Sequence, residues 1–402
     1  MREMNEMVET AVKNDSEIPT HQTIVDRARA LIPLLRERAP MNAENRIINP
    51  DTIRGMKEAG LFRVLQPKRW GGYEAGQRTF AEVQMALAEG DMSVAWIYGV
   101  IGVHAYHMGL LHDQAARDVW GKDTSVLVAS PYMPGGVAKP VEGGYEISGR
   151  WPYSSGCQHC DWTFLGGIVE GSPTDYRSFL IPRADAPVVD TWDTPGLEGT
   201  GSHDVVIEKA FVPEYRTHRM IDGFLGTNPG KAVNYGPLFQ MPFMLVFFRA
   251  ITSSQIGALQ AMVDIFRTYA TDKVFGGAKT AEDPEVQHFL AAAVSGIDEM
   301  KKIMFANFEI MDEYAARGEF PPMEMRQMFR YQSSAVAERC LNLATPLLRM
   351  SGGGGVYERF GMSRIYRNMM TGRQHIAAQF NLHGRKFGNL LLSGASPNDI
   401  LL

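Results

Sequence analysis

Cysteine is scarce in this chain. The 402 residues contain three cysteines, Cys157, Cys160 and Cys340. An odd, small number argues against a disulfide framework, which secreted proteins build from several pairs. Cys157 and Cys160 have the spacing of a metal-binding pair, but no second pair exists to complete a tetrahedral zinc site. The sequence therefore predicts no metal.

A basic excess and a long apolar run are also missing. Lysine and arginine number 40 against 45 acidic residues, a net charge of -5, which argues against a nucleic-acid partner. The most apolar segment, Phe239 to Ile251, is interrupted by Gln240, Pro242 and Arg249, so it is too short to span a bilayer. The polar segment Met1 to Thr20 lacks the pattern of a signal peptide. We expect a cytoplasmic protein without a membrane partner.

Apolar residues make up 45% of the chain, enough for a large core, and their period changes twice. Residues 20–123 have helical spacing and predict an N-terminal helical domain. Residues 124–234 alternate with a period of two, with glycine and proline between the runs, and predict a middle β barrel or sandwich. Residues 235–402 return to long helical patterns and predict a C-terminal bundle. The expected fold class is α+β.

Two motifs carry the chemical signal. The first is the segment Trp151 to Cys157, reading WPYSSGC, which follows a turn and a short apolar strand. It displays hydroxyl groups and an aromatic ring at the rim of a sheet, where a planar cofactor can lie. The second is the segment Met370 to His375, reading MTGRQH, which places a lone histidine at the end of a helical pattern.

These motifs sit in a chain that resembles the acyl-CoA dehydrogenases from about residue 20 to the end. The likeness rests on the helix, sheet, helix order and on the segments Gly60 to Gly72, Leu197 to Ser202, Phe211 to Pro213 and Ser351 to Arg367. Within that superfamily the chain resembles the oxygenase components of two-component flavin monooxygenases, such as p-hydroxyphenylacetate hydroxylase.

That resemblance implies an activity and its partners. Such an enzyme takes reduced FMN or reduced FAD from a separate NAD(P)H-dependent reductase, forms a C4a-hydroperoxide with O2, and hydroxylates a small aromatic, phenolic or indolic substrate. A homotetramer is implied. Two alternatives stay open: an acyl-CoA dehydrogenase-like oxidoreductase, and an N- or S-hydroxylating monooxygenase of the same fold. The first is disfavoured because no carboxylate lies between Glu358 and Asp399 to act as the base that dehydrogenases need.

The resemblance also implies which residues hold the flavin. Ser155 is expected at the flavin N5, and Tyr153 is expected along the ring. The other implied flavin contacts are Ser154, Thr200, Ser202, Phe247 and Lys273. Lys273 stands where the family has an arginine, so it keeps the charge and loses the bidentate geometry.

Catalytic and substrate roles fall on histidines. His375 matches the family histidine that assists proton delivery, and His383 is its rival. His104 and Ser130 match positions that contact the phenol of the substrate, and His104 is expected to draw off its proton. Tyr106 and Phe243 are expected to line the substrate pocket.

Overall fold

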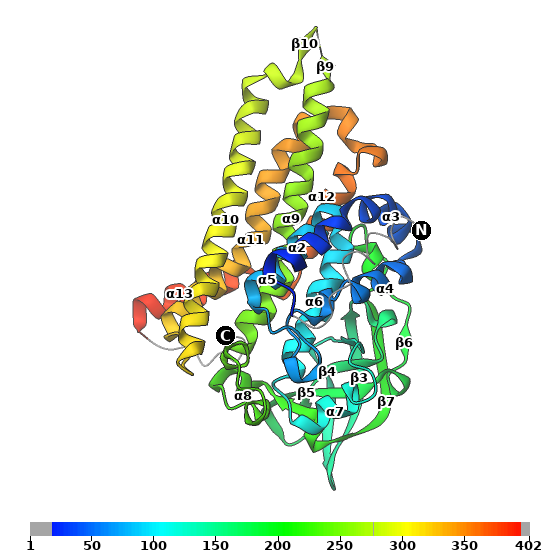
Figure 1. Ribbon diagram of the computed structural model, residues 1–402, viewed down its shortest axis with the longest axis vertical. Coiled ribbons are helices and arrows are strands. Elements are labelled where there is room, and N and C mark those ends of the chain that lie inside the picture. Colours follow the sequence, from blue (N-terminus) through cyan, green and yellow to red (C-terminus); the bar gives the residue numbers. More distant parts are fainter. Residues whose placement is uncertain (1–17, 276, 395–402) are drawn as a thin grey trace.

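The computed structural model describes residues 18–275 and 277–394. Most of the segment on which the cytoplasmic prediction rests lies outside the described residues. Three blocks follow one another along the chain, and they confirm the predicted α+β class: helices, then a sheet, then longer helices (Figure 1). In the described ranges no helix is long and apolar enough to cross a membrane.

From residue 18 onward, where the description of the structure begins, six α-helices form the first block. They are α2 (His21–Ala30), α3 (Ile32–Asn45), α4 (Pro50–Glu58), α5 (Gly76–Gly90), α6 (Met92–Met108) and α7 (Asp113–Trp120). The central one is α6, whose residues are buried on nearly every side. Asp91 begins it by accepting from the backbone N–H of Ser93 at 2.8 Å, and Asn42 donates to the same carboxylate.

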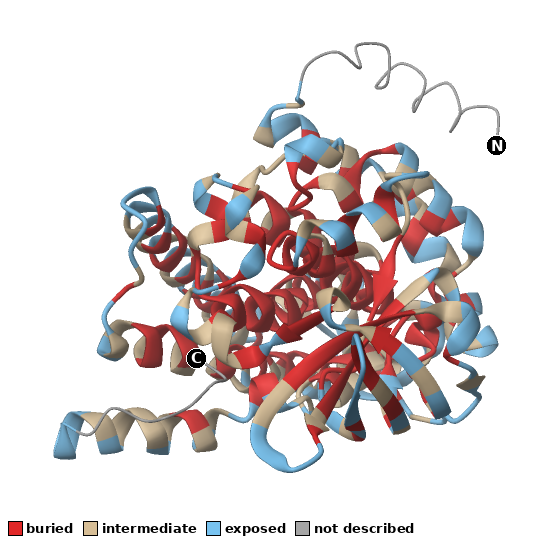
Figure 2. Cartoon of the chain, turned by 90° about the horizontal axis from the view of Figure 1, so that it is seen from below, coloured by how far each residue is buried: buried red, intermediate tan, exposed pale blue. Residues whose placement is uncertain are grey.

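The middle block is one mixed sheet with the strand order β6-β7-β3-β2-β4-β5-β8, and β1 pairs with β4. The strands are β1 (Val128–Ala129), β2 (Pro134–Val141), β3 (Gly144–Ser154), β4 (Trp162–Val169), β5 (Ser172–Pro182), β6 (Val188–Val189), β7 (His203–Pro213) and β8 (Thr217–Arg219). Trp151, Phe179 and their neighbours form a small core of the sheet's own. The other face packs on the helices, whose interior is the larger core (Figure 2).

The last block contains α8 (Met220–Leu225), α9 (Phe243–Asp272), β9 (Val274–Phe275), β10 (Ala278–Lys279), α10 (Pro284–Ala316), α11 (Met323–Met350), α12 (Met362–Gly372) and α13 (Phe380–Ser393). Figure 1 shows α9, α10 and α11 rising side by side from the sheet, with the β9–β10 hairpin at their far end. The base of α9 packs against α6.

Two glycines allow the helices of this block to pack closely against α6. A Cβ at Gly99 would lie 2.3 Å from the carbonyl oxygen of Ala250, so only glycine allows α6 and α9 to come so near. A Cβ at Gly372 would lie 3.0 Å from the ring of Trp96. The end of α12 therefore rests directly on α6, and both segments reach the seam between the helices and the sheet.

Candidate active site

The two sequence motifs meet at Trp96. The indole Nε1–H of Trp96 donates to Oγ of Ser155 at 3.3 Å. On its other side the indole packs edge-on against the imidazole of His375, with ring centroids 5.8 Å apart. Residues that lie 220 positions apart in sequence are thus joined by one side chain of α6.

A ladder of hydroxyl groups extends from this point. Oγ of Ser155 lies 2.7 Å from Oγ of Ser202, which lies 2.6 Å from Oγ1 of Thr200, and Thr200 donates to the carbonyl of Leu197. Because Thr200 spends its proton on Leu197, Ser202 donates to Thr200 and Ser155 donates to Ser202. Ser155 accepts from Trp96 with one lone pair and keeps the other for an outside donor. The structure therefore brings together three of the predicted flavin contacts, Ser155, Ser202 and Thr200.

Tyr153 and Ser154 point in opposite directions at the end of β3. Tyr153 has a φ of 68°, in the left-handed region that disfavours side chains, and its ring is 63% exposed. It packs edge-on against Trp192. Ser154 is fully buried. The strained backbone thus presents an aromatic ring at the surface beside the hydroxyl ladder, whereas the hydroxyl of Ser154 faces the interior.

His375 and His383 occupy different environments. His375 precedes the short 3-10 helix Ile376–Ala378, and its Nδ1 accepts from the backbone N–H of Ala377. Burial and, to a lesser extent, the charge of nearby Arg330 lower its pKa to about 4, so it is neutral at pH 7. His383 is fully buried on α13 and lies 2.7 Å from the guanidinium of Arg330. Of these two histidines, His375 is the one whose ring contacts Trp96, the residue that donates to Ser155.

A second group surrounds His104, two turns along α6 from Trp96. Its ring stacks on Phe247 and meets the edges of Tyr132 and Phe164. Nδ1 of His104 lies 3.0 Å from the hydroxyl of Tyr132, while Nε2 is buried without a hydrogen-bond partner. Burial lowers the pKa of His104 to about 3, so the imidazole is neutral. A neutral imidazole bonded at one nitrogen keeps the other for a ligand.

The other predicted substrate contacts lie around this group. Ser130 follows β1 and is half-buried, two residues before Tyr132. Phe243 is fully buried and packs against Phe247. Tyr106 is fully buried too, but its hydroxyl donates to the carbonyl of Met241 at 2.8 Å. The hydroxyl of Tyr106 is therefore engaged by the backbone, and only its ring is left to enclose a ligand.

Lys273 lies far from the other predicted flavin contacts of its own chain. It caps α9 and donates to the carbonyl of Ser351 at 2.9 Å, with its ammonium over the ring of Tyr269. Gln255 lies beside Gly372, at the level of Trp96. The helix runs on from Gln255 to Asp272 over roughly 26 Å, at about 1.5 Å per residue. Within one chain, Lys273 does not meet the Ser155 group.

Sequence reasoning missed several residues that the structure adds to these groups. Tyr132 bridges His104 and His107 with its hydroxyl, and His218 bonds to His107. His107 carried a signal, because it follows His104 by one helical turn. His218 carried none, because it lies 111 residues further on and approaches only through the fold.

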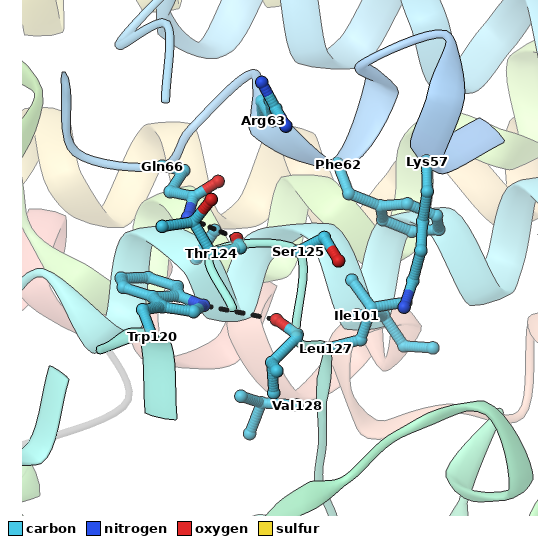
Figure 3. A pocket seen from close by; sticks show the side chains of 12 residues that line it. Lys57, Phe62, Arg63, Gln66, Ile101, Trp120, Thr124, Ser125, Leu127 and Val128 are labelled. Carbon is cyan, nitrogen blue, oxygen red and sulfur yellow. Dashed lines mark hydrogen bonds between the residues drawn. The ribbon is translucent and has the colours of Figure 1, made fainter. Parts of the chain in front are cut away.

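A separate pocket opens beside α6 between the first helices and the segment that leads into β1 (Figure 3). Lys57, Phe62 and Arg63 line one side and Ser125 to Val128 the other. None of the predicted site residues lines it. Among the described residues no group of three histidine, cysteine or acidic side chains is placed to hold a metal ion.

The residues at the seam fit a flavin. A flat ring system with several hydrogen-bonding atoms matches an exposed aromatic ring at Tyr153, the nearby Trp192, and a hydroxyl at Ser155 with one lone pair free to accept. The neutral imidazole of His375 lies behind Trp96. The chemistry of this set is that of a cofactor site which positions a ring and controls protons near it.

Comparisons with known proteins agree with this geometry. The chain matches the family models "Acyl-CoA dehydrogenase, N-terminal domain" over residues 19–114 and "Acyl-CoA dehydrogenase, C-terminal domain" over residues 250–380. It is similar to the HsaA oxygenase subunit of a flavin-dependent monooxygenase from Rhodococcus jostii, 36% identical over 363 residues, which covers 88% of this chain and 94% of the relative. The Mycobacterium tuberculosis HsaA is 32% identical over 95% of this chain and 98% of its own length.

A solved structure shares the whole architecture. The crystal structure of the 3-HSA hydroxylase from Rhodococcus sp. RHA1 superposes with a TM-score of 0.91 at 33% identity, covering 97% of this chain and 100% of that one. Curated relatives with lower identity include a resorcinol hydroxylase at 25% and a p-hydroxyphenylacetate 3-hydroxylase at 22%. The chain therefore belongs to the flavin-dependent monooxygenases with the acyl-CoA dehydrogenase fold, and it is an oxygenase component of that family.

Proposed function

We propose that this oxygenase hydroxylates the ring of a small phenolic substrate beside His104. One observation carries the proposal: Nε2 of His104 is buried, neutral and without a partner inside a group of aromatic rings. A buried polar atom without a partner costs free energy, about 1–3 kcal/mol, which a ligand hydroxyl can recover. The relatives named as hydroxylases of resorcinol and p-hydroxyphenylacetate support a phenol as the substrate class.

His104 is proposed to accept the phenol proton at Nε2. Removing that proton raises the electron density of the ring at the carbon next to the hydroxyl, where an electrophilic oxygen is received. Ser130, half-buried two residues before Tyr132, is proposed to offer a second hydrogen bond at the rim. The rings of Phe243, Phe247 and Tyr106 form the apolar walls. This arrangement discriminates a phenol from the same ring without a hydroxyl.

The flavin is proposed to lie along Tyr153, over the hydroxyls of Ser155, Ser202 and Thr200. A bound reduced FMN or reduced FAD supplies the electrons that activate O2 for transfer of one oxygen atom to the ring. Ser155 would orient the cofactor by accepting a hydrogen bond from it, and Trp96 holds Ser155 in place. His375 is neutral beside Trp96 and its Nδ1 accepts from the backbone, so its proton is on Nε2. His375 is proposed to assist proton delivery by donating from that Nε2.

The reduced flavin is proposed to come from a separate NAD(P)H-dependent reductase, and the oxygenase to act as a homotetramer. The position of Lys273 supports an assembly, because its charge lies too far from Ser155 to meet the tail of a flavin in its own chain. In a tetramer this ammonium is available to a flavin phosphate in a neighbouring copy. We propose that the enzyme works in the cytoplasm, where reduced flavin is produced.

Rapid mixing tests the proposed function. The protein is mixed anaerobically with reduced FMN or reduced FAD, then with oxygenated buffer that contains a phenol or the matching methyl ether. We expect slower return of oxidised flavin than in free solution, and hydroxylated product from the phenol only. Equal turnover of the ether would exclude the proposed role of His104, and return at the free-solution rate with both flavins would exclude oxygen activation.

A further inference from the structure

Five buried side chains form one unbranched chain of hydrogen bonds that begins at His104. Nδ1 of His104 lies 3.0 Å from the hydroxyl of Tyr132, and the same hydroxyl lies 2.5 Å from Nδ1 of His107. Nε2 of His107 lies 2.9 Å from Nδ1 of His218, and Nε2 of His218 lies 2.8 Å from Oδ1 of Asn228. The chain joins α6, the segment before β2, strand β8 and the segment after α8.

The far end of the chain decides the direction of every bond in it. An amide oxygen can only accept, so His218 must donate from Nε2 to Asn228. A neutral imidazole carries one proton, so Nδ1 of His218 accepts from His107. By the same reasoning Nδ1 of His107 accepts from Tyr132, whose oxygen then accepts from Nδ1–H of His104. Nε2 of His104 is left without a proton.

Solvent has little access to this series of hydrogen-bonded side chains. His104, His107 and His218 are at most 1% exposed, and Asn228 is 3% exposed. Burial lowers the pKa of all three histidines, so each stays neutral at pH 7. Because bulk water cannot exchange donors and acceptors freely along the chain, the protein itself has to set the tautomer of each ring.

We propose that Asn228 and His218 are positioning residues that fix His104 as the Nδ1–H tautomer, so that Nε2 is a permanent acceptor for a substrate hydroxyl. This inference rests on the proposed function only in naming the substrate hydroxyl as the occupant. It adds a remote determinant of specificity: Asn228, which four side chains separate from the substrate, decides whether the site recognises a donor or an acceptor.

The same series of hydrogen bonds can move a proton away from the substrate, which leaves a phenolate at the ring and a positive charge at the far end of the series. The O–H bond of the phenol breaks and its proton joins Nε2 of His104. The Nδ1 proton of His104 then passes to Tyr132, the hydroxyl proton of Tyr132 to His107, and the Nε2 proton of His107 to Nδ1 of His218. Nothing is oxidised or reduced. The positive charge ends on His218, whose pKa the bond to Asn228 and the carboxylate of Asp222 both raise against the effect of burial.

Nitrogen-15 NMR of histidine-labelled protein reads the tautomers directly. We expect His104 to be protonated at Nδ1, and His107 and His218 at Nε2, with assignments made from single histidine substitutions. Asn228→Leu removes the acceptor and is expected to leave His104 a mixture of tautomers. Asn228→Asp keeps an acceptor oxygen and is expected to retain the order. Asn234→Ala is the matched control, because Asn234 bonds to the carbonyl of Gly109, outside the chain.

Binding measurements in the absence of flavin complete the test. Asn228→Leu is expected to weaken binding of the phenol about 5- to 10-fold, the worth of roughly one hydrogen bond, and to leave the methyl ether unchanged. A wild-type His104 protonated at Nε2, or wild-type tautomers retained in Asn228→Leu, would overturn the inference. If Asn228→Leu does not fold, the wild-type and Asn228→Asp spectra still decide it. Expected tautomers without turnover of any phenol would instead overturn the proposed function alone.

Discussion

The indole of Trp96 donates a hydrogen bond to the hydroxyl of Ser155. This hydrogen bond links the end of strand β3 to the central helix α6. It also determines what Ser155 can do, since an oxygen that accepts from Trp96 and donates to Ser202 has one lone pair left to accept from a cofactor. The placement of Ser155 therefore depends on a residue from a different block of the fold.

Removing the hydroxyl should uncouple oxygen activation from product formation. For Ser155→Ala we expect the yield of hydroxylated product per reduced flavin to fall at least several-fold, with hydrogen peroxide released in its place. Product and peroxide are measured in the same reaction. Trp96→Phe is the companion variant: it keeps a ring beside His375, loses the donor to Ser155, and should give an intermediate yield at a stability cost of about 1 kcal/mol. Unchanged coupling in Ser155→Ala would remove the serine from the mechanism.

His375 has two separable roles in the structure. Its Nδ1 caps the 3-10 helix Ile376–Ala378, and its ring packs on Trp96. Asparagine can still accept from the backbone of Ala377, so His375→Asn should keep the cap while losing the imidazole. We expect this variant to retain its thermal stability within about 1 kcal/mol and to lose roughly tenfold or more in the rate of product formation.

The corresponding change in the rival histidine distinguishes the two. His383 bonds to Arg330 in the buried part of the C-terminal helices. His383→Asn should therefore lower the melting temperature and alter the rate of the folded enzyme little. The reverse pattern, with His383→Asn inactive and well folded, would transfer the catalytic assignment from His375 to His383.

The backbone at Tyr153 offers a test of strain. A non-glycine residue at a φ of 68° costs on the order of 1 kcal/mol, and the ring of Tyr153 is mostly exposed, so it contributes little packing in return. Tyr153→Gly is expected to keep or raise the free energy of unfolding, by up to about 1 kcal/mol, and to weaken binding of reduced flavin several-fold. Titration of anaerobic protein with reduced FMN gives the affinity. A stabilised variant with full flavin affinity would mean that the strain serves no ligand.

The sequence was sufficient for the architecture because each block has its own period. Helical spacing before residue 123, alternation in the middle and long helical patterns afterwards follow directly from which faces must be buried. The fold family was identified from short motifs such as WPYSSGC, whose residues are consecutive in the sequence. Both kinds of signal are local, and the structure confirms the fold they predict.

The site was harder to predict, since its contacts are not local. Ser155, Ser202 and Thr200 could be predicted because two short segments, 151–157 and 197–202, contain them. His218 and Asn228 were not, because nothing in the sequence indicates that β8 ends beside α6. Lys273 is the opposite case, because the sequence placed it among the flavin contacts. The structure places it at the far end of the long helix α9, away from the other predicted flavin contacts of the same chain.

The burial of His104 predicts a pH dependence of stability. Its pKa is about 3 in the folded protein and near 6.5 in the unfolded chain. As the pH falls below about 6.5, the unfolded chain binds a proton that the folded protein refuses, so stability decreases as the pH falls and is complete above that value. At pH 5 this histidine alone should cost about 2 kcal/mol relative to pH 7.

His104→Gln removes that titration, so the variant should lose about 2 kcal/mol less than the wild type between pH 7 and pH 5. Urea unfolding at each pH measures the difference, with both proteins at the same concentration because an assembly would stabilise each of them. Between pH 7 and pH 8 the two curves should run parallel, which separates the effect of protonation from that of lost packing. Equal losses on acidification would show that the folded protein and the unfolded chain protonate His104 alike, so that burial does not lower its pKa.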